Sequence, residues 1–515
     1  MDRFQQFSDL NISKWQLART ILLTRLVLLF AMAVSCHFIP DHNPGDDVLR
    51  FHLRLRDKDN SCFCLAGYSC DTTGVRHAPA DLACADLDSS LEIPSKNLVA
   101  TYQFILNPIT KWDSARFLTL AADRSMRYPL ECSDDEVCED RFMLSEQQHA
   151  FLPLFPWLIQ NMAKTLTFLP KAYLPPTYEG QLALSAWILN LLFFLLATFG
   201  LYDLTSSVCN PKLAMASCLV FAINPASVFF SSAYSESLFA MCTFGGHALA
   251  ARGMVTAAVV PWTAASYTRA NGTINSAWLL LRGISSGLNG KSILDGLLRL
   301  LYHIILAVVV ALPVRYHDVQ GYDLHCSSSQ EFQPTWCEED RTTFSLYSWT
   351  QRRHWNVGFL RYYHWKQVPN FLLAAPILFL GFWAVYLWID SSMKGYVKDK
   401  RMSLELLVPW AFDSLRRSIP PPQTHSSLGY EEQLLLKNPY LLGHYAVLAA
   451  VCSVGLTIAH IQISTRLICS SCPAMIWFLS DRIIKRDRLG VAVLAYCGLY
   501  ILLGVILYVN FLPWT

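Results

Sequence analysis

Charged side chains are what this 515-residue chain has least of. Asp, Glu, Lys and Arg together make up 16% of its residues, whereas apolar residues make up 53%. A soluble globular domain carries about 25% charged residues, so the composition indicates a polytopic membrane protein. Four stretches contain none of these four residue types, and each is long enough to cross a hydrocarbon core about 30 Å thick as a helix: 181–202, 213–235, 368–389 and 489–515.

The apolar runs also lack the polar–apolar alternation of membrane β-strands, which leaves α-helices as the spanning element. We therefore predict an all-α polytopic membrane protein, a helical bundle of about eight to eleven transmembrane helices, with the middle of the chain ambiguous. Weaker candidate spans lie at 20–39, 150–168, 237–251, 253–268, 293–314, 439–458 and 461–480.

An excess of charge of one sign is absent as well. The net charge is +2, so no nucleic-acid partner is expected. Basic residues precede the first apolar run, which places the amino terminus in the cytoplasm, together with the basic loops 394–401 and 481–488. Residues 41–150 and 316–366 then form two large loops on the opposite, lumenal side.

Cysteines occur in even numbers in both of these loops. The first loop holds six, and the second holds Cys326 and Cys337. Even counts on the non-cytoplasmic side indicate disulfides in an oxidising lumen, and they make 41–95 a disulfide-rich insertion. A zinc site at 62–64 is the less favoured alternative, because no paired CxxC and no nearby His supports it.

No internal repeat or low-complexity tract is visible in the chain. We therefore treat 1–515 as a single integral-membrane unit. The absence of a repeat also counts against a transporter built from inverted repeats. Within the first loop, 96–128 returns to a helical apolar period, which predicts one or two amphipathic helices along the membrane surface.

Trp112 and Asp113 are the first pair that could carry chemistry. A carboxylate at the membrane surface can accept a proton from a substrate hydroxyl, and a Trp ring can stack on a sugar face. From spacing alone, an interfacial anchor followed by a helix cap is an equally physical interpretation, and the more frequent one.

Polar residues at membrane depth form a second group, in "AINPASVFFSSAYSESLFA" (222–240). Such groups are costly in a bilayer and usually face a cavity or a neighbouring helix. Glu236 is the strongest candidate, because an ionisable residue that ends a charge-free span needs a partner. A helix boundary that emerges at the membrane interface is the alternative.

Cations suited to a phosphate occur in two later segments. Arg269 stands between apolar stretches, where an Arg can grip a phosphate through two parallel hydrogen bonds. A positive-inside residue on the cytoplasmic side is the alternative, and the more frequent one. Residues 347–371 mix aromatic rings with Arg361 and other cations, which fits a glycolipid headgroup or a snorkelling aromatic belt. His460, Gln462 and Arg466 are weak signals inside a late apolar region.

Together these residues predict a lumen-facing cavity with carboxylates, cations and aromatic rings. That combination suits transfer chemistry on a lipid-linked sugar. On the residues alone, a lipid-linked sugar transporter or flippase, or another dolichyl-phosphate-sugar-dependent glycosyltransferase, stays open.

Six longer motifs then occur in order: "KWDSARFLTLA", "AFLPLFP", "NPASVFFSSAYSESLF", "TRANG", "WNVGFLRYYHWKQVPNFLLAAPIL" and "AHIQISTR". In these motifs, from about residue 15 to 510, the chain resembles the family of the second mannosyltransferase of GPI-anchor biosynthesis. This family comprises eukaryotic α-1,6-mannosyltransferases of the GT-C class.

The resemblance implies a multi-pass enzyme of the endoplasmic reticulum membrane with a lumenal active site. It implies that dolichyl-phosphate mannose is the donor and a one-mannose GPI glycolipid precursor the acceptor. No cofactor is implied, since a single leaving phosphodiester does not demand a divalent metal. The resemblance leaves open both a metal and a small membrane subunit as a partner.

The resemblance also assigns roles to residues. It places the catalytic acid of the first lumenal loop at Asp113, which we expect to be the general base of an inverting displacement. Arg361 or Arg269 is expected to stabilise the departing phosphate. The residues implied in substrate binding are Trp112, Glu146, Asn224, Glu236, Arg269 and Arg361.

Overall fold

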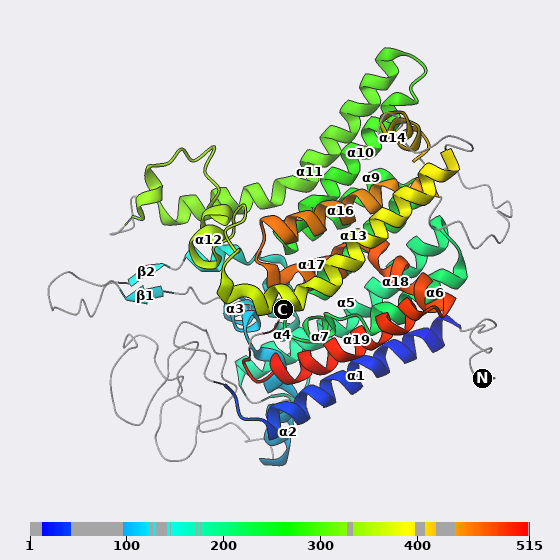
Figure 1. The fold of residues 1–515 in the computed structure, drawn as a ribbon. Helices are drawn as coiled ribbons and strands as arrows, with labels where there is room; N and C mark the ends of the chain where they lie inside the picture. The colour runs from blue at the N-terminus through cyan, green and yellow to red at the C-terminus, as the bar shows by residue number, and fades with distance from the viewer. Residues whose placement is uncertain are drawn as a thin grey trace.

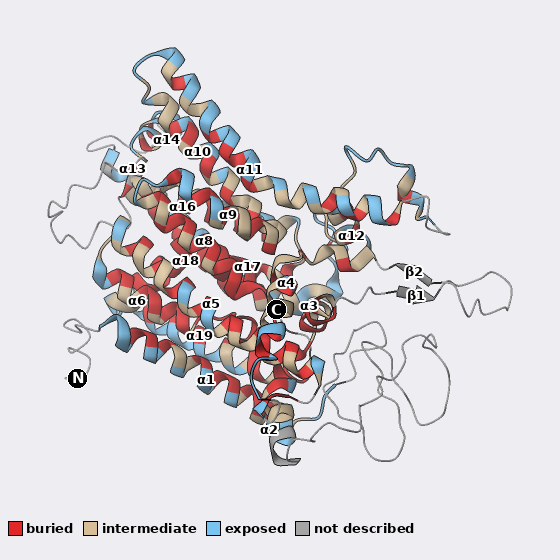
Figure 2. Cartoon of the chain, turned by 180° about the vertical axis from the view of Figure 1, so that it is seen from behind, coloured by how far each residue is buried: buried red, intermediate tan, exposed pale blue. Residues whose placement is uncertain are grey.

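The computed structural model describes residues 13–42, 96–122, 127–129, 142–144, 146–170, 173–175, 177–326, 333–396, 407–418, 438–512 and 514. In these ranges the chain is almost entirely helical, which confirms the all-α class. The helices pack into one bundle whose most buried parts are α5 (Tyr178–Val208), α8 (Glu236–Ala251), α17 (Ser464–Ser471) and α18 (Pro473–Lys485) (Figures 1 and 2). The six cysteines expected in the first loop lie outside the described residues.

Among the described residues, five helices are long and apolar enough to cross a membrane, so the chain is a multi-pass membrane protein. They are α1 (Lys14–Phe38), α5, α11 (Ile293–His325), α13 (Val368–Tyr396) and α19 (Arg488–Leu507). A sixth span is counted if η10 (Ile461–Ile463) and α17 are joined to α18, from which they are bent by 81°.

This number is below the eight to eleven that we expect from the sequence. The reason is that several apolar runs form helices shorter than a span, packed inside the bundle. Residues 237–251 and 253–268 fall on α8 and α9 (Val255–Thr268), which have 16 and 14 residues. Residues 213–235 break at Asn224 into α6 (Pro211–Ala222) and the short α7 (Ser227–Ser231).

Shorter elements connect these helices. In the first half they are α2 (Lys96–Leu106), η2 (Asn107–Thr110), α3 (Asp113–Ala121), η3 (Glu146–Ala150), α4 (Leu154–Leu166), and the antiparallel strands β1 (Arg127–Pro129) and β2 (Phe142–Leu144). In the second half they are η5 (Ala270–Thr273), α10 (Ile274–Leu288), η6 (Thr335–Glu338), α12 (Leu346–Trp355), η7 (Trp365–Gln367), α14 (Leu407–Arg416), η9 (Pro439–Leu441) and α16 (Leu442–Thr457).

Local sequence accounts for the helix boundaries. Ser13 and Gln16 form a reciprocal capping box at the start of α1. Asn210 caps α6 and is followed by Pro211, whose fixed φ suits the first helical position. Ser292 and Asp487 cap α11 and α19 in the same way.

Many helix ends therefore meet inside the bundle rather than at its surface. Hydrogen bonds and ion pairs join the start of α3, the α7–α8 junction, the end of α9 and α17, and α3 lies at the same end of the bundle as α12 (Figure 1). Irregular backbone at such a depth is tolerated where it is buried in protein or lines a cavity. These junctions carry the candidate site.

Candidate active site

Asp113 is the first residue of α3, and its carboxylate keeps a free face. Its side chain is 37% exposed, and its backbone N–H donates a hydrogen bond to the Tyr234 hydroxyl at 3.0 Å. The preceding residue, Trp112, has φ +56°, a conformation that costs energy for a residue with a Cβ. Such strain persists where the surroundings fix it and is often found at functional sites.

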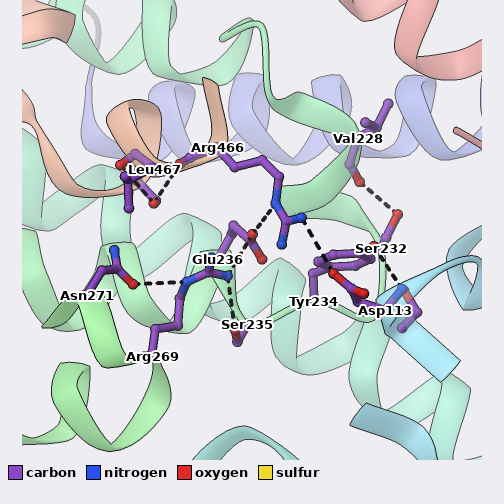
Figure 3. Close-up of polar contacts among 12 residues, drawn as sticks. Asp113, Val228, Ser232, Tyr234, Ser235, Glu236, Arg269, Asn271, Arg466 and Leu467 are labelled. Carbon is purple, nitrogen blue, oxygen red and sulfur yellow. Dashed lines mark hydrogen bonds and ion pairs between the residues drawn. The ribbon is translucent and has the colours of Figure 1, made fainter. Parts of the chain in front are cut away.

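Arg466 of α17 links Asp113 to a second carboxylate. Its Nη1 lies 3.6 Å from Asp113 Oδ2, and its Nε donates to Glu236 Oε1 at 2.7 Å (Figure 3). The guanidinium also lies over the rings of Phe229 and Tyr234, 4.5 and 4.7 Å from their centroids. These contacts fix a cation beside the exposed acid.

Glu236 begins α8 and is completely buried. Besides Arg466, it binds Arg269, whose Nη1 lies 2.7 Å from the same Oε1. Arg269 is in turn held by the Asn271 side chain and the Ser235 hydroxyl, both at 3.3 Å. The partner expected for Glu236 is thus a pair of arginines, one from α17 and one from the residue that follows α9.

The hydroxyl of Tyr234 accepts the hydrogen bond from Asp113 N–H. Hydrogen bonds to the backbone around Tyr234 hold this residue in place. Asn190 of α5 donates from its amide to the carbonyl oxygens of Ser232 and Tyr234 across the α7–α8 junction. The Asn224 side chain serves the preceding break: its Oδ1 accepts from Ala226 N–H at 2.8 Å, and its Nδ2 donates to Phe221 C=O at 2.7 Å. Asn224 thus shapes the backbone through contacts with its own segment.

The C-terminal segment holds the loop before Asp113. Trp112 Nε1 donates to the Tyr508 carbonyl at 3.1 Å, and its ring contacts Phe511. The Tyr508 hydroxyl donates to the Lys111 carbonyl at 3.0 Å. Lys111 itself is buried and forms an ion pair with Asp41 at 2.7 Å. These contacts fix the strained turn from both sides.

Glu146 lies in η3 and pairs with α12 rather than with the Asp113 cluster. Its Oε1 is 3.2 Å from His354 Nε2. Burial lowers the pKa of His354, as do the charges of Arg116 and Arg353, against the opposing effect of Glu146. Arg116, whose charge acts on His354, lies on α3 one turn after Asp113. The Glu146–His354 pair therefore lies beside α3.

Arg361 lies outside this group of contacts. It is exposed, and its carbonyl accepts from Asn356 Nδ2 at 3.1 Å in the loop after α12. The structure therefore brings together Asp113, Glu236, Arg269 and Arg466. It places Glu146, Asn224 and Arg361 in separate local networks.

Comparisons with known proteins identify the family of the chain. The family model described as mannosyltransferase (PIG-V) matches residues 91–515. The chain belongs to this family of mannosyltransferases. Among its relatives, GPI α-1,6-mannosyltransferase 2 of Mus musculus is 27% identical over 488 residues, covering 82% of this chain and 90% of the relative.

GPI α-1,6-mannosyltransferase 2 of Homo sapiens is 27% identical, over 80% of this chain and 88% of the relative. GPI mannosyltransferase 2 of Drosophila pseudoobscura pseudoobscura is 29% identical, with 72% and 82% covered. No solved structure matches the fold of this chain.

In this mannosyltransferase, sequence reasoning undervalued two residues. Arg466 was a weak signal, because an Arg in an apolar run is also typical of a helix end. Asn190 was missed, although an Asn within the otherwise apolar run 181–202 is a usable sign of a buried hydrogen-bonding role. Neither partner of Arg466 is near it in sequence: the Arg466–Glu236 bond spans 230 residues.

Proposed function

We propose that this mannosyltransferase transfers the second mannose of a GPI anchor. The donor is dolichyl-phosphate mannose, and the acceptor is the 6-hydroxyl of the mannose on a one-mannose GPI precursor. The names of the relatives support a GPI acceptor and the α-1,6 linkage. The donor follows from the resemblance of the ordered motifs.

The observation that carries the proposal is the exposed carboxylate of Asp113 beside the guanidinium of Arg466, with 3.6 Å between them. A glycosyl transfer without a covalent enzyme intermediate needs one group that accepts the proton of the acceptor hydroxyl. It needs another group that stabilises the negative charge on the leaving phosphate. Asp113 is the member of the cluster with a free face toward substrate, since Glu236 is fully buried.

The reaction is a single in-line displacement. Asp113 accepts the proton of the acceptor hydroxyl while that oxygen bonds to C1 of the donor mannose. The bond between C1 and the phosphate oxygen breaks, and its electron pair leaves with dolichyl phosphate. Inversion converts the β-linked donor into the α-linked product.

The arginines of the cluster stabilise the negative charge of the departing phosphate. Arg466 and Arg269 share Glu236, so they present two positive charges against one buried negative charge. When Asp113 takes up the proton, it ceases to neutralise Arg466. That cation then faces the phosphate at the moment when negative charge develops on it. Arg361 of the exposed loop after α12 is the alternative cation for this step.

We further propose that the site faces the lumen of the endoplasmic reticulum. Cys326 and Cys337, the candidate pair, form a disulfide at the end of α11, and disulfides form in oxidising compartments. Gly321, one turn before this disulfide, approaches His149 of η3, the element that carries Glu146. Thus the disulfide and the α3 site lie at the same end of the bundle.

The functional test is the GPI intermediate that accumulates without this protein. In cells that lack it, mass spectrometry of GPI lipids should show one-mannose precursor, and re-expression should restore the two-mannose product. Microsomes from such cells, given dolichyl-phosphate mannose and the one-mannose precursor, should form product only when the chain is present. A normal two-mannose pool in the deleted cells would overturn the proposal.

A further inference from the structure

A small polar pocket lies at the opposite end of the bundle from the Asp113 cluster. It has a volume of about 210 Å³ and lies between the α8–α9 turn and the α10–α11 hairpin, where Thr256, Arg282, Ser286, Tyr302 and His303 line it. The 16 residues of α8 separate Glu236 from this turn, a distance of about 24 Å along a helix. The pocket thus plays no part in the transfer site.

Glycines bring the two helices of the hairpin close enough to form the pocket wall. A Cβ on Gly283 would lie 2.7 Å from His303 Cβ, and a Cβ on Gly296 would lie 2.6 Å from the Gly287 carbonyl oxygen. Small residues spaced by four positions allow such close packing between membrane helices. The hairpin projects from the bundle at the upper right of Figure 1.

Arg282 is the cation of the pocket, and it has no acidic partner among the described residues. The neighbouring arginines differ: Arg299 binds Asp295 and Arg252 binds Asp203, both at 3.0 Å. The guanidinium of Arg282 instead lies over the Trp278 ring, 5.5 Å from its centroid. A partly buried guanidinium without a carboxylate is ready to bind an anion.

The start of α9 adds a second feature that favours an anion. Val255 is the first residue of this helix, and the preceding Met254 supplies no side-chain cap to its first N–H groups. The Thr256 hydroxyl is instead hydrogen-bonded to Tyr302 at 2.6 Å. Uncapped N–H groups and the positive end of the helix dipole attract phosphate.

The side chains around the pocket indicate that the phosphate belongs to a lipid. The wall helix α11 exposes apolar side chains next to Tyr302, including Leu298, Leu301 and Ile305, each more than half exposed. In a membrane protein such a face lies against acyl chains. We propose that the pocket binds the phosphate of an anionic phospholipid headgroup, with its acyl chains along α11.

The test uses the purified full chain in detergent and three probes: dioctanoyl phosphatidic acid, dioctanoylglycerol and inorganic phosphate. Phosphatidic acid should raise the thermal unfolding midpoint with saturable dose dependence. Dioctanoylglycerol, with the same tails and no phosphate, should not. Inorganic phosphate should need at least a tenfold higher concentration for the same shift. Equal potency of inorganic phosphate would overturn the lipid assignment.

Variants locate the binding. Arg282→Gln should weaken phosphatidic acid binding at least tenfold, whereas Arg417→Gln, in an exposed pair with Asp413, should not change it. Should Arg282→Gln fail to fold, Ser286→Leu fills the pocket and keeps the charge, and it should weaken binding equally. An unchanged affinity in a folded pocket variant would overturn the proposal. Mannose transfer without added phosphatidic acid should survive in these variants.

Discussion

Glu236 and Arg466 form a buried ion pair, with 2.7 Å between Oε1 and Nε. Because Arg269 binds the same oxygen, one carboxylate compensates two guanidinium groups inside the bundle. Removing one partner of a buried ion pair leaves an uncompensated charge, which typically costs about 3–5 kcal/mol.

Glu236→Gln should therefore lower the stability of the folded protein strongly, by about 3 kcal/mol or more. It should also abolish transfer, because Arg466 then loses its buried carboxylate partner. The thermal unfolding midpoint in detergent measures the first effect and a mannose-transfer assay the second. Asp413→Asn, in an exposed pair on α14, is the control and should change neither. A Glu236→Gln protein with wild-type midpoint and activity would contradict this role.

Arg25 of α1 should hold the α6–α7 break in place. It is buried, and it donates to the carbonyl oxygens of Ala222 and Ser227. Arg25→Met leaves these acceptors without a donor, so we expect a loss of about 2 kcal/mol of stability, read as a lower unfolding midpoint. Arg19→Met, at an exposed position of the same helix, should have little effect. Equal midpoints for the two variants would show that Arg25 does not hold the break.

Acid should destabilise the end of the bundle that carries η3, through His149. Burial lowers the pKa of His149 from its ordinary value of 6.5 to about 3, with further lowering by His317 and His325. The folded state thus prefers the neutral ring, and its stability contribution is complete above pH 6.5. That contribution is lost as the pH falls from 6.5 towards 3, by about 1.4 kcal/mol per pH unit for one proton.

The measurement for His149 compares unfolding midpoints at pH 7 and pH 5. The wild-type protein should lose more stability over this interval than His149→Gln, which has no ring to protonate. An identical pH dependence of the two proteins would assign the acid sensitivity to other groups.

The Cys326–Cys337 disulfide should be present in protein isolated from membranes. It joins the end of α11 to η6 across 11 residues, and a loop of this size is stabilised by about 3 kcal/mol. Alkylation before reduction, followed by mass spectrometry, should leave both cysteines unmodified. The double change to Ser should lower the unfolding midpoint. Recovery of both as alkylated thiols would contradict a disulfide and the lumenal placement of this loop.

Sequence reasoning predicted the individual members of the site better than their connections. Asp113 and Glu236 were recognisable because an ionisable group is conspicuous in a charge-poor chain. Their link through Arg466 was not, since it depends on how α3, α8 and α17 pack, and no local pattern encodes that packing.

The predicted number of membrane helices exceeds the five or six long apolar helices of the described residues for a related reason. Hydropathy shows that a segment is apolar. It does not show whether the segment faces lipid or packs inside the helix bundle. The helix α8 is apolar because other helices surround most of it, and both α8 and α9 are shorter than a typical span. The break at Asn224 was similarly ambiguous, because the same amide suits a ligand or its own backbone.

The most direct test of the central claim is mannose transfer by Asp113→Asn. The change keeps the size of the side chain and leaves the backbone N–H bond to Tyr234 in place, so the protein level and unfolding midpoint should stay near wild type. A lost general base typically lowers a rate by about 10²–10⁴-fold. We therefore expect transfer to the one-mannose precursor to fall at least about 100-fold. A folded Asp113→Asn protein with wild-type transfer would show that Asp113 is not the base.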